Sequence, residues 1–322
     1  MPEEAHDTAG FRIIITLLTA MVSSGVYGQS ETNFESEFAQ PWLIHTADAG
    51  EILVVPFAQG LANPFDLAFR DNGDILVTER YTGQLRIIRE GVLLPSAVIG
   101  VPDVYSEVFR AGLMSVALHP DNDALVFLSY TKPIEVESEP EQTVALARGI
   151  LDGDQLVNVE EIFVAKGLDR GIAAAKLLFA PDGHLLMSIG GAYMYMGLGG
   201  YAQDPAVHYG KLLRLDSNGA PAADNPFLES GKFLPEVYSV GHRNQIGMDF
   251  HPQTGELWAS ENGPQGGDEV NIIRPGANYG WPGVSYSRQY RGDWVSDRQW
   301  QSDVVQPEIL WWPSIAPAGL AF

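Results

Sequence analysis

Residues 176–188 read KLLFAPDGHLLMS, which is an apolar segment, a turn rich in Pro, Asp and Gly, and a second apolar segment. The same order of features recurs at 66–78 (DLAFRDNGDILVT), 115–129 (SVALHPDNDALVFLS) and 247–260 (GMDFHPQTGELWAS). In each copy, alternating apolar residues lead into a tight turn and continue after it, which is the pattern of a β-hairpin. The sequence therefore predicts four related hairpins.

The spacing of these hairpins indicates how they assemble. They recur about every 50 to 70 residues, and no stretch of the chain shows a sustained helical heptad. An all-strand repeat of that length is typical of the blades of a β-propeller. Two jelly-roll domains would also supply strands, but they would not repeat one hairpin at this period. We therefore predict an all-β fold built as a propeller.

The last residues, 317–322 (PAGLAF), are similar to the beginning of a fifth copy. A propeller closes its last blade against its first, because an unclosed ring leaves strand edges unpaired. We therefore expect residues 41–322 to form about four to five blades of a longer ring, incomplete at the C-terminus.

The N-terminal residues have a different character. Residues 11–21 (FRIIITLLTAM) form an apolar run too short for a comfortable membrane span, and small or polar residues follow it as far as Gln29. We expect residues 1–28 to be a signal peptide and residues 29–40 a flexible linker. The protein would then be secreted or periplasmic, with no stable membrane insertion after cleavage. A buried strand or an uncleaved anchor is the alternative.

The composition excludes several classes of function. The chain has 41 acidic and 19 basic residues, giving a formal net charge of −22. Such a surface repels phosphate backbones, so nucleic acid is not an expected partner. Cysteine is absent, which excludes disulfides, thiolate metal sites and cysteine nucleophiles.

The most unusual loop lies in residues 260–282, SENGPQGGDEVNIIRPGANYGWP. Its glycine and proline residues predict an irregular backbone with exposed carbonyl oxygens, and Asp268 and Glu269 add carboxylates. Oxygen ligands of this kind suit a hard cation such as calcium. An ordinary acidic turn is the alternative interpretation.

This segment resembles the glucose/sorbosone dehydrogenase family, and most of all its aldose sugar dehydrogenase branch. Other matching pieces follow in colinear order, namely 63–69 (NPFDLAF), 78–80 (TER), 112–114 (GLM), 119–121 (HPD), 202–205 (AQDP), 210–215 (GKLLRL), 223–227 (ADNPF), 241–244 (GHRN) and 312–317 (WPSIAP). The family consists of six-bladed propellers that oxidise aldoses at the C1 hydroxyl to lactones with pyrroloquinoline quinone (PQQ) and calcium. The resemblance implies a quinoprotein oxidoreductase that uses an aldose sugar and an electron acceptor.

The resemblance also implies cofactor contacts. The arginine and asparagine of the family's GHRN motif contact the quinone, and they match Arg243 and Asn244. The guanidinium group of an arginine presents two parallel N–H donors, which suit the carboxylates of the cofactor. A structural ion pair is the alternative role for Arg243. Asn262 and Arg110 match further cofactor positions, and Arg110 stands where the family has glutamine.

Two calcium positions follow from the same resemblance. Gly263 and Pro264 match the residues whose carbonyls hold the calcium of the cofactor. Glu269 and Tyr279 match a second calcium site of the aldose branch. All four positions are intact in this sequence.

The catalytic position of the family is changed. A histidine there removes the proton of the sugar hydroxyl, which requires a group that titrates near neutral pH. The matching residue is Ile172, which cannot accept a proton, and the aspartate that orients the histidine corresponds to Gly191. We therefore expect reduced or lost activity. The alternative function is a non-catalytic extracytoplasmic propeller that binds a sugar or a protein partner.

Another histidine could replace the missing base. His208 lies in a predicted loop and is the best candidate for a displaced base, whereas His119, His184 and His251 fall in predicted turns. His242, next to Arg243, is expected to be a packing residue or to support the residues that bind the ligand. A metal-dependent lactonase on a similar propeller is a third class of function, for which we assign no ligands.

Overall fold

The computed structural model describes residues 40–47, 50–107, 111–134, 141–167, 174–190, 198–290 and 292–322. The chain divides into two compact units, Met1–Gln59 and Gly60–Phe322. In the first unit, β1 (Trp42–Thr46) and β2 (Gly50–Val54) form an antiparallel hairpin. The signal peptide expected at residues 1–28 lies outside the described residues.

The described residues of the second unit form four antiparallel sheets of four strands each, in which neighbouring strands follow one another along the chain. The strands of the first sheet are β3 (Pro64–Phe69), β4 (Ile75–Glu79), β5 (Gln84–Arg89) and β6 (Val92–Leu93). Those of the second sheet are β7 (Leu113–His119), β8 (Asn122–Ile134), β9 (Glu141–Asp152) and β10 (Gln155–Val164). Those of the third are β11 (Leu177–Phe179), β12 (Leu185–Ile189), β13 (Lys211–Leu215) and β14 (Val237–Val240). Those of the fourth are β15 (Gln245–Phe250), β16 (Leu257–Glu261), β17 (Asp268–Ile273) and β18 (Ile309–Trp311).

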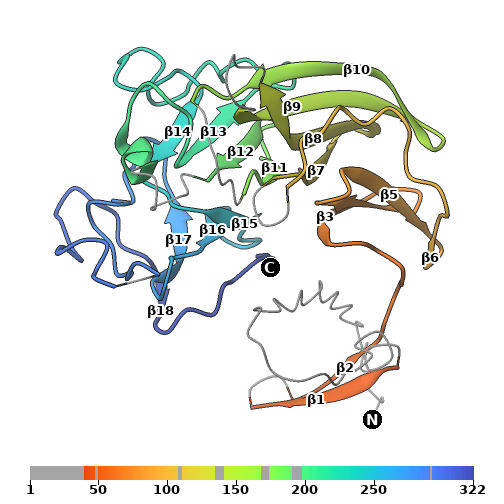
Figure 1. The fold of residues 1–322 in the computed structure, drawn as a ribbon, viewed down its shortest axis with the longest axis horizontal. Helices are drawn as coiled ribbons and strands as arrows, with labels where there is room; N and C mark the ends of the chain where they lie inside the picture. The colour runs from red at the N-terminus through yellow and green to blue at the C-terminus, as the bar shows by residue number, and fades with distance from the viewer. Residues whose placement is uncertain are drawn as a thin grey trace, which may run out of the picture. The chain divides into compact units, whose positions relative to one another are not determined.

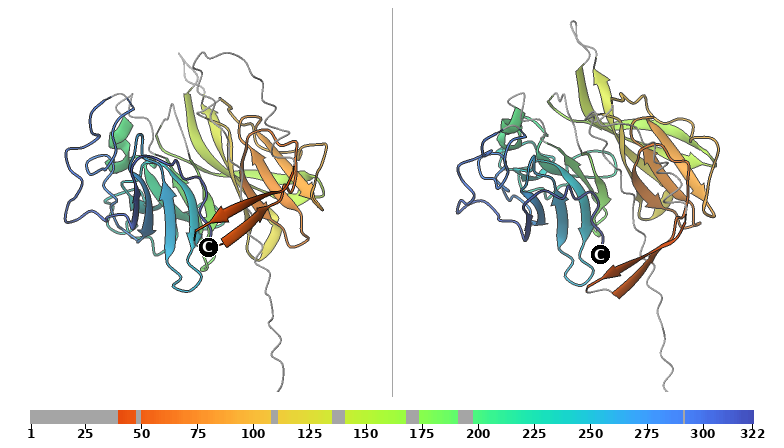
Figure 2. Two further views of the ribbon diagram at one scale, coloured as in Figure 1. Left: turned by 90° about the horizontal axis from the view of Figure 1, so that it is seen from below. Right: turned by 60° about the horizontal axis from the view of Figure 1, so that its bottom comes forward.

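The sheets are arranged as propeller blades. They follow one another in chain order (Figures 1 and 2), and β7 contacts both β3 and β11. The short 3₁₀ helix η2 (Leu198–Gln203) lies between β12 and β13. No helix in the described ranges is long and apolar enough to cross a membrane. The predicted all-β propeller fold is confirmed, with four blades in the described part of the chain.

The four predicted hairpins are confirmed as the first two strands of the four blades. Residues 176–188, for example, contain β11 and β12, and Leu177 pairs with Met187. The segment expected to begin a fifth copy, 317–322, forms no strand. Instead, the N–H of Phe322 donates to the Asp249 carboxylate of β15 at 2.9 Å.

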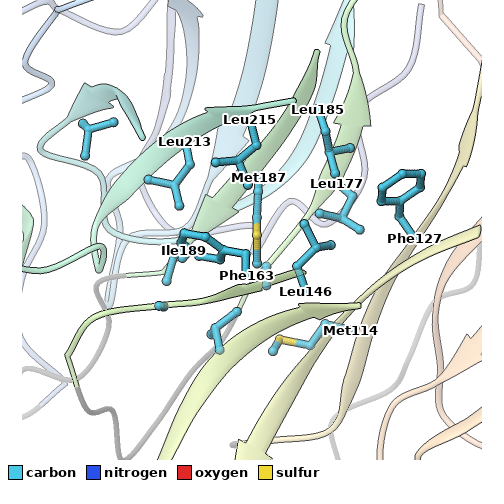
Figure 3. Close-up of a cluster of buried hydrophobic side chains, with 14 of the residues drawn as sticks. Met114, Phe127, Leu146, Phe163, Leu177, Leu185, Met187, Ile189, Leu213 and Leu215 are labelled. Carbon is cyan, nitrogen blue, oxygen red and sulfur yellow. The ribbon is translucent and has the colours of Figure 1, made fainter. Parts of the chain in front are cut away.

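The hydrophobic core lies between successive blades. Strand β12 has both of its faces buried, which is why it reads as an almost continuous apolar run. Met187 belongs to a cluster with Phe127 and Leu146 of the second blade (Figure 3). Leu186 points to the other side and belongs to a cluster with Met248 of the fourth blade. The third blade is therefore packed on both sides.

A buried hydroxyl joins each of the first three blades to the next. It lies in the second strand and donates to a backbone carbonyl in, or just before, the first strand of the following blade. The pairs are Thr78 with Met114 (2.8 Å), Ser129 with Ala175 (2.5 Å) and Ser188 with Gln245 (2.9 Å). The same hydroxyls accept a backbone N–H from their own hairpin, donated by Asp66, Ser115 and Lys176 respectively. We call Thr78, Ser129 and Ser188 the inter-blade hydroxyls.

Candidate functional site

Of the residues predicted to bind the cofactor and calcium, those that the structure describes lie in or next to the fourth blade. Arg243 and Asn244 lie in the connection from β14 to β15, and residues 262–264 lie in the loop from β16 to β17. The N–H of Asn262 donates to the carbonyl of Asn244 at 3.1 Å, so the two connections are adjacent. Glu269 follows at the beginning of β17.

Arg243 is a buried cation without an acidic partner in the described part of the chain. Its Nη1 donates to the carbonyl of Asn262 at 2.7 Å, and its Nη2 lies 3.5 Å from the hydroxyl of Tyr290. The guanidinium lies 5.5 Å from the ring of Trp281. Burial lowers the pKa of Arg243, and its Nε has no hydrogen-bond partner among the described residues. The structure gives no support there to a structural ion pair, and an anionic ligand would compensate the buried charge.

Unpartnered amide atoms lie beside Arg243. The Oδ1 atoms of Asn244 and Asn262 are buried and have no hydrogen-bond partner among the described residues. Gln245, which the sequence reasoning missed, is only 1% exposed, and both polar atoms of its side chain lack a described partner. Buried polar groups are normally satisfied, so such a group of atoms marks a place where a ligand can supply hydrogen bonds. The sequence does contain a signal for Gln245, because this residue brings an amide side chain directly after the GHRN motif.

The buried carboxylate of Glu261 and the half-buried carboxylate of Glu269 face each other across two strands of the fourth blade. Glu261 of β16 and Glu269 of β17 are register partners. Burial raises the pKa of Glu269 to about 8, and the charge of Glu261 contributes in the same direction. His242 Nδ1 lies 3.2 Å from Glu261, and no Lys or Arg of the described ranges forms an ion pair with either carboxylate. A cation between them would relieve their repulsion.

A cavity of about 10 Å³, room for one water or ion, borders Glu261, Glu269 and Gly263. The described residues contain no group of three or more His, Cys, Asp or Glu side chains that could hold a metal. A calcium ion would therefore need backbone carbonyls as additional ligands. The hydroxyl of Tyr279 donates to the carbonyl of Ile272 at 2.7 Å, so only the backbone carbonyl of Tyr279 is suited to this role.

His208, the candidate for a displaced base, is 1% exposed. Its Nδ1 accepts the N–H of Lys166 at 2.8 Å, and its Nε2 lies 3.2 Å from the Glu236 carboxylate. Burial lowers the pKa of His208, and Glu236 opposes that effect. Both ring nitrogens have partners, so accepting a proton from a sugar would require one of these contacts to break.

The positions of the altered reaction centre, Ile172 and Gly191, lie outside the described residues, as does Arg110. His242 has the packing role expected for it. Its ring stacks on Tyr279 at 4.5 Å between centroids, and its Nε2 lies 2.8 Å from the hydroxyl of Ser239.

Comparison with known proteins extends these observations. The glucose/sorbosone dehydrogenase family matches over residues 61–322. The aldose sugar dehydrogenase YliI of Escherichia coli is 33% identical over 271 residues, which cover 81% of this chain and 71% of that protein. The apo-form crystal structure of the soluble aldose sugar dehydrogenase from Escherichia coli has a TM-score of 0.73 and 32% identity, covering 80% and 75% of the two chains. The PQQ-bound aldose sugar dehydrogenase from Streptomyces coelicolor has a TM-score of 0.65 and 28% identity, covering 88% and 76%.

Proposed function

Because the chain belongs to the glucose/sorbosone dehydrogenase family of oxidoreductases, we propose that its fourth-blade site binds PQQ together with calcium and takes an aldose sugar as substrate. The observation that carries this proposal is the group of buried, unpartnered polar atoms on Arg243, Asn244 and Asn262. A similar protein has been solved in a PQQ-bound form. We further propose that the protein acts outside the cytoplasm after removal of residues 1–28.

The chemistry of these donors fits a quinone that carries several carboxylates. The guanidinium of Arg243 supplies a fixed fork of N–H donors and lacks an acidic partner in the described ranges. The amides of Asn244 and Asn262 can accept or donate next to it, and Arg110 is proposed as a further contact. When bound, the quinone supplies the two-electron acceptor that sugar oxidation requires. The chain itself binds and orients the cofactor.

We propose two calcium positions in the same region. The carbonyls of Gly263 and Pro264 would hold the ion that accompanies the cofactor. Glu269 and the carbonyl of Tyr279 would hold the second ion. The facing carboxylates of Glu261 and Glu269 support the second position, because no Lys or Arg of the described part of the chain forms an ion pair with either of them.

Removal of the hydroxyl proton is the step for which this chain lacks the family residue. Oxidation at C1 requires a base within hydrogen-bond reach of the sugar hydroxyl. Ile172 cannot serve, and Gly191 cannot orient a base. We therefore propose that turnover is reduced or lost. The presence of Ile172 and Gly191 at these positions favours a second candidate function, a non-catalytic propeller that binds a sugar or a protein partner.

The experiment that tests the proposal is a titration of the purified protein with PQQ, with calcium and with a chelator, followed by absorbance. Aldose-dependent reduction of a dye by the same samples measures turnover. Calcium-dependent binding with reduction would support a working dehydrogenase. Binding without reduction would support the cofactor site and the non-catalytic function. Absence of binding in the presence of calcium would contradict the cofactor site.

A further inference from the structure

We propose that Asp268 is the positioning residue of the fourth-blade site. Its carboxylate joins the loop 262–267 to the segment 314–316 and so determines where the carbonyls of Gly263 and Pro264 lie. What the loop binds rests on the proposed function, whereas the connection made by Asp268 does not depend on it.

The side chain of Asp268 is fully buried at the first position of β17. Its Oδ1 accepts the N–H of Gly263 at 2.9 Å. Its Oδ2 accepts three donors, which are the hydroxyl of Ser314 (2.5 Å) and the N–H groups of Ile315 and Ala316 (both 2.7 Å). One carboxylate therefore holds two segments that lie more than 40 residues apart in the chain.

The Asp268 side chain acts only as an acceptor in these contacts. All four partners donate to its two oxygens. Ala316 has a φ of 51°, in the left-handed region, and the consecutive N–H groups of Ile315 and Ala316 converge on the same oxygen. Such a concave pair of N–H groups binds anions. An asparagine would place an NH₂ group against at least one of these donors.

The joined segments have little freedom to move separately. A Cβ on Gly263 would lie 2.1 Å from the carbonyl oxygen of Gly266, and one on Gly266 would lie 2.4 Å from Nε1 of Trp312. Asn262 Nδ2 also donates to the carbonyl of Pro317 at 3.2 Å. A shift of segment 314–316 is therefore transmitted to the loop that carries Gly263.

The connection reaches the cofactor residues as well. The carbonyl of Asn262 accepts Nη1 of Arg243 at 2.7 Å, and Asn262 directly precedes Gly263. Releasing Gly263 from Asp268 would displace the carbonyl that holds the guanidinium of Arg243. Asp268 would thus affect ligand binding without touching the ligand, and groups that orient the residues around a metal commonly change affinity about 10- to 100-fold.

The test compares Asp268→Asn with Asp249→Asn. Asp249 also holds the C-terminal segment, through the N–H of Phe322 at 2.9 Å, but it does so from the fifth position of β15, and among the described residues its side chain forms no hydrogen bond with loop 262–267. Two readouts are taken, PQQ affinity in the presence of calcium and hydrogen exchange of peptides covering 262–267 and 312–317. Ser314→Ala, which removes one donor and keeps the carboxylate, serves as a milder variant if Asp268→Asn folds poorly.

We expect Asp268→Asn to weaken PQQ binding at least tenfold and to accelerate exchange in both peptides together, with a smaller change of the same kind in Ser314→Ala. Asp249→Asn should leave both readouts unchanged. Faster exchange in 312–317 alone would overturn the proposed connection, and unchanged PQQ affinity with faster exchange in both peptides would overturn the positioning role. If the unaltered protein binds no PQQ, the proposed function fails, and the exchange measurement still decides whether Asp268 joins the two segments.

Discussion

Replacing Ser188 by alanine removes the inter-blade hydroxyl between the third and fourth blades. Ser188 is fully buried. Its hydroxyl donates to the carbonyl of Gln245 and accepts the N–H of Lys176, both at 2.9 Å. Alanine offers neither interaction. The substitution therefore leaves the part-buried N–H of Lys176 and the buried carbonyl of Gln245 without this partner.

The size of the expected loss in stability follows from the cost of leaving polar groups without a hydrogen-bond partner. A buried polar group left without its partner costs about 1–3 kcal/mol, so the loss of both contacts should lower the free energy of unfolding by about 2–4 kcal/mol. That is a large part of the roughly 5–15 kcal/mol by which a folded domain is stable. Ser188→Thr keeps a hydroxyl at this position, as Thr78 does in the first blade, and should lose much less.

Urea unfolding followed by fluorescence measures the effect, provided that the m value stays constant. Ser230→Ala is the matched control, because the exposed Ser230 hydroxyl also makes two contacts, donating to the carbonyl of Phe227 at 3.2 Å and accepting the N–H of Lys232 at 3.3 Å, but at the surface. The control should change stability by no more than about 0.5 kcal/mol. An equally small loss in Ser188→Ala would refute the reasoning, because the hydroxyl would then contribute nothing to the contact between blades.

Three further results are expected. Arg243→Ala should weaken PQQ binding at least tenfold in the absorbance titration, and an unchanged affinity would remove Arg243 from the site. Ile172→His combined with Gly191→Asp should raise aldose-dependent dye reduction only if the unaltered protein already binds PQQ, and a rise without such binding would contradict the assigned reaction centre. Because the pKa of Glu269 is raised from 4.5 to about 8, the folded calcium-free protein keeps a proton that the unfolded chain releases. Its stability should therefore fall as pH rises from about 5 to 8, and urea unfolding with a chelator should show a smaller fall in Glu269→Gln.

The hairpins could be predicted from the sequence because their determinants are local. Residues 176–188 carry the alternation, the turn residues and the terminal hydroxyl within one short segment. The segment 317–322, which is similar only to the beginning of such a copy, does not form a strand. A strand is stable only when a neighbour completes its hydrogen-bond ladder, and local alternation does not supply that neighbour.

The site could be predicted only in part. Arg243 and Asn244 were found through a contiguous motif, and the structure places them beside Asn262. Asp268 was read as a candidate cation ligand, whereas its carboxylate is occupied by donors from residues 263 and 314–316. Such a contact cannot be predicted from local sequence, because only the fold brings residue 263 and residues 314–316 together. Glu261 was missed as the partner of a second carboxylate for the same reason.

The proposed ligand site of the fourth blade is linked to the third blade through two neighbouring residues. The hydroxyl of Ser188 holds the carbonyl of Gln245, and the residue before it, Asn244, lies so close to β12 that a Cβ on Gly190 would be 2.9 Å from its Oδ1. The amide of Asn244 is therefore positioned by the contact between blades. Because coupling between two equilibria is reciprocal, a ligand bound to Asn244 must stabilise that contact by the same free energy with which the contact favours binding. A protein that had lost turnover but kept this ligand would still use the ligand to hold its blades together.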